Sequence, residues 1–359
     1  MPVETRPVNI RRVGPLSNPS GLRACLAAVA LLVALLALPQ TALAACTRAP
    51  ADGAYFVTDR EPVGGDQLFS GERGLTKGRE AIVTRGVIME QGGGYREQRC
   101  SSEKAFFTAL SQSFAPKGAR QVLLYIHGYY TTFRTGIKEG LAIRRGLHFT
   151  GPLVVYSWPA KVTSRLAYVK DEANAGWSIS RFRRFVASLV DRYRDLPVYI
   201  TSHSLGSRFA ADGIETIRRG PCKACFRRAL FFAPDIDADT LHAALADTGL
   251  CRGRPPETPK NSAPVTLYVS NKDVALRESQ RLHGFQRAGQ AGNELLLCGG
   301  VDTVDVGYHK MTDRTGHGYH VDARVLHDAR AAFDGIAPTN PRRKLSVATR
   351  NRGRYYELR

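Results

Sequence analysis

The sequence lacks the patterns typical of membrane-spanning, zinc-binding and nucleic-acid-binding proteins. Its main apolar run, residues 24–38, is shorter than the roughly 20 residues that a membrane-spanning helix needs. Its Cys222–Cys225 motif (Cys-x-x-Cys) has no second such motif and no His pair at metal-binding spacing, which argues against a zinc site. No basic face interleaved with aromatic residues and no nucleic-acid-binding module is recognisable. We therefore expect no metal and no nucleic-acid partner.

Acidic residues are scarce relative to basic ones. There are 32 Asp and Glu residues against 51 Lys and Arg residues, which gives a formal net charge of +19. The excess is spread along the chain, although residues 340–359 alone contribute +6. Such a charge favours attraction to an anionic membrane surface or an acidic polymer. With Pro338, Pro341 and several arginines, residues 338–359 are predicted to form a disordered basic tail.

The N-terminal segment has the composition of a signal peptide. Arg11, Arg12 and Arg23 precede the apolar run, and small residues follow it at positions 42–45. A charged region, an apolar core and a small-residue cleavage site in this order are typical of secretory leaders. Residues 1–45 are therefore predicted to be a leader that directs export of the protein.

Cys46 has two alternative fates. The segment 43–46, Leu-Ala-Ala-Cys, resembles a bacterial lipobox, in which the cysteine carries the lipid anchor. The exported part, however, contains an even number of cysteines, and lipidation would leave an odd thiol in an oxidising compartment. These cysteines are Cys46, Cys100, Cys222, Cys225, Cys251 and Cys298. The protein is thus expected to be periplasmic or a membrane-anchored lipoprotein.

From Ala105 onward, apolar strands alternate with amphipathic helices. The strand candidates are 122–126, 153–157, 198–201, 229–233 and 265–269, each an almost continuous apolar run. Strands that are buried on both faces have this composition. Alternation of this kind predicts an α/β fold with a doubly wound, mainly parallel sheet that carries helices on both faces. We assign this domain to residues 105–337, after an N-terminal extension of short strands at 46–104.

Residues 198–207, Val-Tyr-Ile-Thr-Ser-His-Ser-Leu-Gly-Ser, predict a nucleophilic serine. A strand runs into a helix-forming stretch, and the small residues Ser202 and Gly206 flank Ser204. In a nucleophile elbow, small residues two positions before and after the serine allow the sharp strand-to-helix turn that exposes its hydroxyl. Ser204 is therefore the candidate nucleophile.

The strand 122–126 is followed by His127 and Gly128, where the oxyanion-hole loop of such a fold belongs. We expect the backbone N–H groups of Tyr129 and Leu205 to bind the oxyanion. His127 is interpreted as structural, because it precedes the nucleophile in the chain. Two further aromatic residues, Tyr130 and Trp158, are candidates for lining the substrate pocket, although Trp158 could equally be a core residue.

The acid and the base are expected at the ends of later strands, in the chain order Ser, acid, His. Asp273 follows strand 265–269 in a tight polar turn and is the preferred acid, with Asp235 or Asp237 as alternatives. His317 lies between two glycines in a loop before the last helix, so it can approach the serine closely and is the preferred base. His320 is the second choice for the base and His309 the third.

Several motifs in order resemble a bacterial α/β-hydrolase family of esterase/lipase-like domains whose substrates are largely undefined. They are 55–60 (Tyr-Phe-Val-Thr-Asp-Arg), 125–129 (Tyr-Ile-His-Gly-Tyr), 151–159, 168–171, 202–206, 233–237 and 267–276. The resemblance covers roughly residues 50–335 and implies the α/β-hydrolase fold with Ser204, Asp273 and His317 as the catalytic residues. The chain departs from the family at Tyr130, where an asparagine is usual, which affects the hydrogen bonding of the oxyanion loop.

Together these features predict an exported serine hydrolase that cleaves a small-molecule or lipid carboxylic ester through an acyl-enzyme intermediate, without a cofactor. An amidase, a peptidase or an acyltransferase could use the same three residues. A hypothesis from another functional class is that the chain is a catalytically silent hydrolase-fold protein, which serves as a binding or scaffold protein of the cell envelope. Its basic tail would then contact anionic lipid or polymer. Lipidated Cys46 or the tail could bring either protein to a membrane surface.

Overall fold

The computed structural model describes residues 46–359 except 115–119, 161–167, 293–294, 309–313 and 351–352. The predicted signal peptide, residues 1–45, lies outside the described residues, and so does His309. Residues 45–359 form one compact unit. Its helices are α2 (Glu103–Ser111), α3 (Phe133–Gly146), α4 (Tyr168–Arg192), α5 (Gly206–Arg219), α6 (Ala238–Asp247), α7 (Val274–His283) and α8 (Ala323–Phe333).

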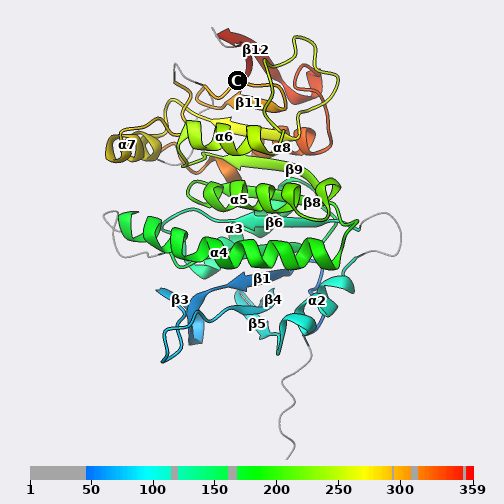
Figure 1. Ribbon diagram of the computed structural model, residues 1–359, viewed down its shortest axis with the longest axis vertical. Coiled ribbons are helices and arrows are strands. Elements are labelled where there is room, and N and C mark those ends of the chain that lie inside the picture. Colours follow the sequence, from blue (N-terminus) through cyan, green and yellow to red (C-terminus); the bar gives the residue numbers. More distant parts are fainter. Residues whose placement is uncertain (1–45, 115–119, 161–167, 293–294, 309–313, 351–352) are drawn as a thin grey trace, which may run out of the picture. The chain divides into compact units, whose positions relative to one another are not determined.

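Within the described residues, one 11-stranded sheet organises the unit, in the order β12-β13-β11-β10-β9-β8-β6-β7-β1-β4-β5 (Figure 1). The strands from β13 to β1 pair in parallel, whereas β12 adds antiparallel to β13 at one end, and β4 and then β5 add antiparallel to β1 at the other. The strands are β1 (Ala54–Thr58), β4 (Thr84–Gln91), β5 (Gly94–Arg99), β6 (Val122–Ile126), β7 (Leu153–Ser157), β8 (Val198–His203), β9 (Phe226–Phe232), β10 (Val265–Val269), β11 (Val301–Asp305), β12 (Leu345–Arg350) and β13 (Gly353–Leu358). Strands β2 (Arg60–Gly64) and β3 (Leu68–Arg73) form a separate pair.

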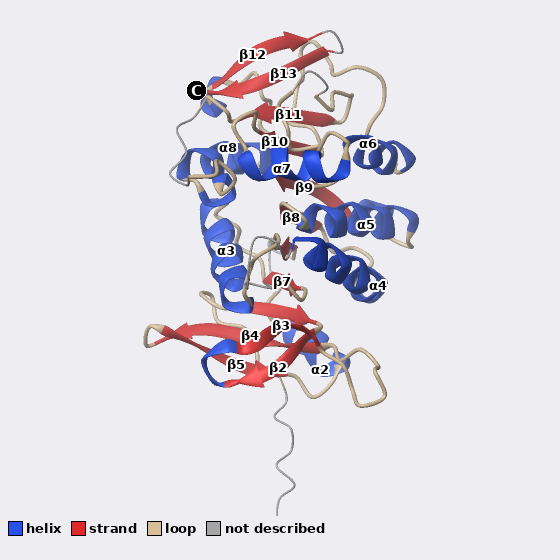
Figure 2. Ribbon diagram, turned by 90° about the vertical axis from the view of Figure 1, so that its left-hand side faces the viewer, coloured by secondary structure: helices blue, strands red, loops and turns tan. Residues whose placement is uncertain are grey.

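Helices cover both faces of this sheet. Helices α3 and α8 lie on one face, and α4, α5 and α6 lie on the other (Figure 2). Each face has its own apolar core, in which side chains of the central strands alternate between the two layers. All residues of β6, β7 and β10 are buried, as expected for strands that are covered on both sides. The doubly wound, mainly parallel α/β fold expected from the sequence is confirmed.

The C-terminal segment corrects one prediction. Residues 338–359 do not form a disordered tail, because they contain the hairpin β12–β13, and β13 pairs in parallel with β11. Arg343 is fully buried and holds Asp328 of α8 with Nε–Oδ1 and Nη2–Oδ2 distances of 2.7 and 2.9 Å. The arginines of this segment led us to predict that it is exposed to solvent. An arginine can nevertheless be buried when each of its nitrogens donates to a carboxylate or another oxygen, as those of Arg343 do.

Disulfide bonds join Cys46 to Cys100, Cys222 to Cys225, and Cys251 to Cys298 among the described residues. The Cys222–Cys225 motif is therefore a local disulfide. A sulfur atom in a disulfide cannot also carry a lipid, so this pairing favours the disulfide alternative for Cys46. None of the described helices is long and apolar enough to cross a membrane.

Candidate active site

Ser204 occupies a sharp turn between β8 and α5. Its backbone φ is +53°, in the left-handed region that L side chains rarely adopt, so the turn stores local strain of the kind found at nucleophile elbows. Two hydrogen bonds hold it there: the Ser204 N–H donates to the Phe232 carbonyl at 3.0 Å, and the Asp235 N–H donates to the Ser204 carbonyl at 3.2 Å. The geometry is that of the elbow expected from the sequence.

Two glycines allow the elbow to approach the end of β6. A Cβ atom at Gly206 would lie 2.5 Å from the Ile126 carbonyl oxygen, and one at Gly128 would lie 2.9 Å from the Ser204 Cβ. Because the backbone and the serine leave no room for these Cβ atoms, Ser204 and the loop that follows β6 can lie this close only with glycine at both positions. The small residue at position 202 is a serine, whose hydroxyl lies 3.2 Å from that of Ser207.

Asp273 and His317 are in direct contact. The His317 Nδ1–H donates to the Asp273 Oδ2 at 2.7 Å, and both side chains are largely buried. The other carboxylate oxygen, Oδ1, accepts the Leu276 N–H at 3.0 Å and so caps the N-terminus of α7. The loop that carries the histidine is fixed on the same turn, since the Val274 N–H donates to the Thr315 carbonyl at 2.9 Å. Chain segments far apart in sequence thus hold this pair rigidly.

His203, next to the serine, connects the elbow to the histidine loop. Its Nε2–H donates to the His317 carbonyl at 3.1 Å, and its ring stacks on His320 with centroids 3.7 Å apart. Burial lowers the pKa of His203 well below its ordinary value, and the charges of His320 and His317 lower it further, so it remains neutral. His320, the second choice for the base, lies 3.5 Å from Glu139 and does not contact Asp273.

A buried arginine, Arg60, holds the loop that follows β6 in place. Arg60 donates from Nη2 to the Thr131 carbonyl at 2.7 Å and to the His127 Nε2 at 3.2 Å. Burial lowers the pKa of Arg60 to about 9, which leaves it charged at neutral pH. Burial, and then the charge of Arg60, lowers the pKa of His127 to about 3, which agrees with the structural role expected for it.

The two aromatic pocket candidates do not line the pocket beside Ser204. Trp158 is 0 % exposed, donates from Nε1 to the His127 carbonyl at 2.9 Å and stacks on Phe209, so it is a core residue. Tyr130 is 44 % exposed and adopts φ +55°, with its N–H donating to Asp171 Oδ2 at 3.2 Å. An asparagine, which is usual here in the related family, tolerates that backbone conformation better than tyrosine.

A pocket of about 250 Å³ opens beside Ser204. It is lined by Tyr129, Tyr168, Asp235, Val274, Ala275, Glu278, Ser279, Leu282 and Thr315. It therefore lies between the oxyanion loop, the start of α4, the end of β9 and helix α7. A strained serine, a histidine–carboxylate pair and an adjoining pocket together have the composition of a site for acyl transfer.

Residues 102–330 match the family described as "Alpha/beta hydrolase of unknown function (DUF900)". The chain belongs to this family. The resemblance expected from the motifs is therefore confirmed, and the protein is an α/β hydrolase. Among curated proteins, none matches it.

Three of the solved structures similar to this α/β hydrolase illustrate the likeness. One from Xanthomonas campestris pv. campestris, assigned to the α/β superfamily of hydrolases, has 14% identity over 60% of this chain and 96% of that chain, with a TM-score of 0.29. A predicted CIB-like hydrolase from Thermoplasma acidophilum has 13% identity over 69% and 98%, with a TM-score of 0.31. An extracellular α/β-hydrolase from a Paenibacillus species has 13% identity over 56% and 86%, with a TM-score of 0.23.

The alternative acids of this hydrolase have other partners. Asp235 accepts hydrogen bonds from Tyr168, Ser279 and Arg287, and Asp237 caps α6 by accepting the Thr240 N–H at 2.8 Å. The sequence assigned no site role to the three partners of Asp235: Tyr168 belongs to the family-like motif 168–171 without a stated function, and Ser279 and Arg287 carry no motif of their own. Across the described part of the chain, no group of three or more His, Cys, Asp or Glu side chains could hold a metal ion.

Proposed function

We propose that this α/β hydrolase cleaves carboxylic esters with Ser204 as nucleophile, His317 as general base and Asp273 as the residue that orients the base. The observation that carries the proposal is the 2.7 Å hydrogen bond from His317 Nδ1 to Asp273 Oδ2. The loop that contains His317 is bonded in turn to His203, the residue before Ser204. A carboxylate at Nδ1 fixes the tautomer in which Nε2 can accept the serine proton.

In the proposed reaction, the Ser204 Oγ bonds to the ester carbonyl carbon while its proton passes to His317. The N–H groups of Tyr129 and Leu205 stabilise the oxyanion that forms on the carbonyl oxygen. His317 then gives its proton to the departing alkoxide, and the acyl-enzyme remains. Water, deprotonated by His317, attacks this intermediate, and the serine leaves with the proton as the carboxylic acid is released.

We also propose that the mature enzyme works in the cell envelope, as its leader and its cysteines suggest. Intact-mass measurement of the mature protein from the cell tests the fate of Cys46. A non-reduced mass lacking two hydrogens for each cystine, with no added lipid, supports a soluble periplasmic form. A diacylglycerol adduct on Cys46 would contradict the Cys46–Cys100 disulfide and place the enzyme on a membrane.

The ester-hydrolase proposal is tested with a fluorophosphonate probe, which reacts only with activated serines. Purified residues 47–359 would be treated with the probe, and the adduct would be mapped by mass spectrometry. This form lacks Cys46 and so cannot form the Cys46–Cys100 disulfide, and the full mature chain would therefore be tested in parallel. We expect labelling at Ser204 that is lost in Ser204→Ala and in His317→Ala. Ser101→Ala and His242→Ala, which change exposed residues far along the chain from the site, are matched controls and should keep it.

Labelled protein would next be assayed on ester, amide and acyl-acceptor substrates, because the same three residues can serve all three reactions. Turnover of esters above the other two supports the proposal. A folded protein that is not labelled would instead favour a catalytically silent envelope scaffold. In that case, Arg342→Gln combined with Lys344→Gln, which removes exposed positive charge and keeps β12 and β13, should impair its binding to anionic lipid or polymer.

A further inference from the structure

One aromatic side chain closes the pocket beside Ser204. Tyr168, the first residue of α4, lines the pocket, and its ring contacts that of Tyr129 edge to face with centroids 5.4 Å apart. On its other side it contacts the His283 ring at 5.8 Å. The ring is therefore held between the oxyanion loop and the end of α7.

The hydroxyl group of Tyr168 is anchored by a buried charge network. It donates to Asp235 Oδ2 at 2.7 Å, while Asp235 Oδ1 accepts from Ser279 Oγ at 2.6 Å and Arg287 Nε at 2.8 Å. Asp235, Ser279 and Arg287 are all at least nine-tenths buried. Burial raises the pKa of Tyr168, and the neighbouring carboxylate raises it further, so the phenol stays protonated and remains a donor. The ring is thus a fixed wall rather than a mobile side chain.

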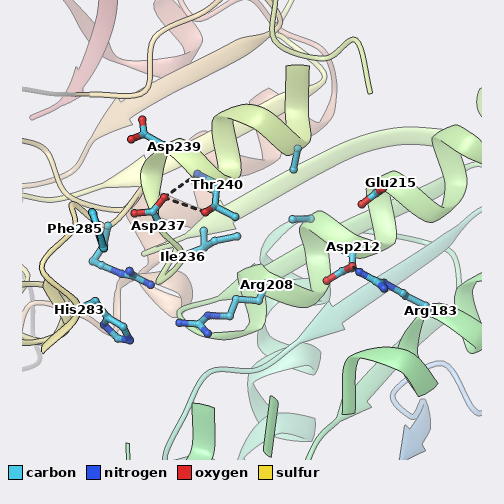
Figure 3. A pocket seen from close by; sticks show the side chains of 13 residues that line it. Arg183, Arg208, Asp212, Glu215, Ile236, Asp237, Asp239, Thr240, His283 and Phe285 are labelled. Carbon is cyan, nitrogen blue, oxygen red and sulfur yellow. Dashed lines mark hydrogen bonds and ion pairs between the residues drawn. The ribbon is translucent and has the colours of Figure 1, made fainter. Parts of the chain in front are cut away.

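A second and larger cavity lies behind this wall. It has a volume of about 710 Å³ and is lined by residues of α4, α5 and α6, by the end of α7 and by the loop after it, including Arg208, His283 and Arg287. Arg208 and His283 extend toward one another from α5 and α7 (Figure 3), and both contact Glu172, at 2.6 and 2.9 Å. Tyr168 and Asp235 line the inner pocket, whereas His283, which contacts Tyr168, and Arg287, which contacts Asp235, line the outer cavity behind them.

The size of the inner pocket limits what it can hold. An engineered cavity of about 150 Å³ accommodates benzene, so by proportion 250 Å³ holds about ten non-hydrogen atoms. Pockets for larger ligands have volumes of roughly 300–1,000 Å³, a range that the outer cavity reaches and the inner one does not. With the wall in place, an ester group and only a short chain fit beside Ser204.

We propose that Tyr168 is a specificity-determining residue that restricts this enzyme to short-chain esters by forming a fixed wall of the small pocket at Ser204. The inference rests on the proposed ester hydrolysis and adds the substrate class. The short chain can belong to the acid or to the alcohol, since both lie near the reacting carbon. Removing the ring enlarges this pocket toward His283 and admits a longer chain.

The test compares Tyr168→Ala with Tyr168→Phe in the full mature protein. The first variant removes the wall, whereas the second keeps the ring and removes only the hydroxyl group. Values of kcat/KM would be measured for p-nitrophenyl acetate, butanoate, hexanoate and octanoate, and for acetate esters of alcohols of increasing length. We expect the wild type to prefer the short esters. The octanoate-to-butanoate ratio, or its alcohol counterpart, should rise at least tenfold in Tyr168→Ala and remain near the wild-type value in Tyr168→Phe.

The outcomes separate this inference from the function on which it rests. Unchanged ratios in a Tyr168→Ala protein that still reacts with the fluorophosphonate probe at Ser204 would overturn the role proposed for Tyr168. The proposal of ester hydrolysis would remain. An equal change in both variants would also overturn it, because the ring would then not be the cause. A wild type that neither reacts with the probe nor cleaves any ester would overturn both. Probe labelling and thermal melting of each variant show that it is folded.

Discussion

Asp273 has two roles in the structure, and substitution by asparagine separates them. Its Oδ2 accepts the His317 Nδ1–H, and its Oδ1 caps α7 by accepting the Leu276 N–H. Asparagine keeps an acceptor oxygen for the cap, where Asn and Asp are about equally favourable. Its amide group, however, donates to Nδ1 and moves the proton to Nε2, so that His317 can no longer accept the proton of Ser204.

The size of the expected effect follows from these two roles. In a serine hydrolase triad, loss of the correct tautomer lowers kcat by about 10⁴-fold, which corresponds to about 5 kcal/mol in the activation free energy. The free energy of unfolding should change by less than about 0.5 kcal/mol, because the cap remains. Asp273→Ala should lose both functions, with a similar fall in kcat and a further loss of about 1 kcal/mol in stability.

The assay pairs ester turnover with urea unfolding for the wild type, Asp273→Asn and Asp273→Ala. Burst amplitudes with a p-nitrophenyl ester would report the fraction of active sites, so that misfolded protein is not counted as slow enzyme. A folded Asp273→Asn variant with kcat within tenfold of the wild type would refute the assignment of Asp273 as the orienting acid. A loss of activity that only parallels a loss of folded protein would refute it as well.

Three further predictions concern stability and the elbow. Arg343→Met should lower the free energy of unfolding by about 3–5 kcal/mol, because it leaves Asp328 buried without its cation, and the double variant with Asp328→Leu should recover much of this loss in urea unfolding. Gly206→Ala should abolish probe labelling in soluble protein, since its Cβ would lie 2.5 Å from the Ile126 carbonyl oxygen; normal labelling would contradict the close approach. Burial raises the pKa of Asp305 to about 6, so the folded state binds this proton more tightly than the unfolded chain and loses stability as the pH rises from about 4 through 6. Asp305→Asn should therefore raise the melting temperature at pH 7 but not at pH 4, and an equal change at both values would exclude this cause.

The central part of the fold was predictable because its strands are buried on both faces. Runs such as 122–126 and 265–269 are apolar throughout, and the helices between them are amphipathic, so the alternation itself indicates a doubly wound sheet. The elbow was predictable from small residues around Ser204, which the backbone at φ +53° requires. Chain order selected Asp273 and His317, and the structure brings these two together.

The features that the sequence did not reveal depend on contacts between distant segments. Arg343 resembles any exposed arginine until α8 supplies Asp328, fifteen residues earlier, as its buried partner. The wall formed by Tyr168 depends in the same way on Asp235, which lies on another strand end. Trp158 was ambiguous because a tryptophan at the end of a strand can face either a pocket or the core, and only the packing against Phe209 decides it.

The order of strands in the sheet bears on how this protein can be divided. The segment that matches the family, residues 102–330, excludes β1, β4 and β5 at one end of the sheet and β12 and β13 at the other. A protein cut to that segment would expose β7 and β11, two fully buried strands, as open edges ready to pair with other chains. The segment that matches the family is thus shorter than the sheet, and shortened versions for crystallisation or library screening should keep β1, β4 and β5 at one end and β12 and β13 at the other.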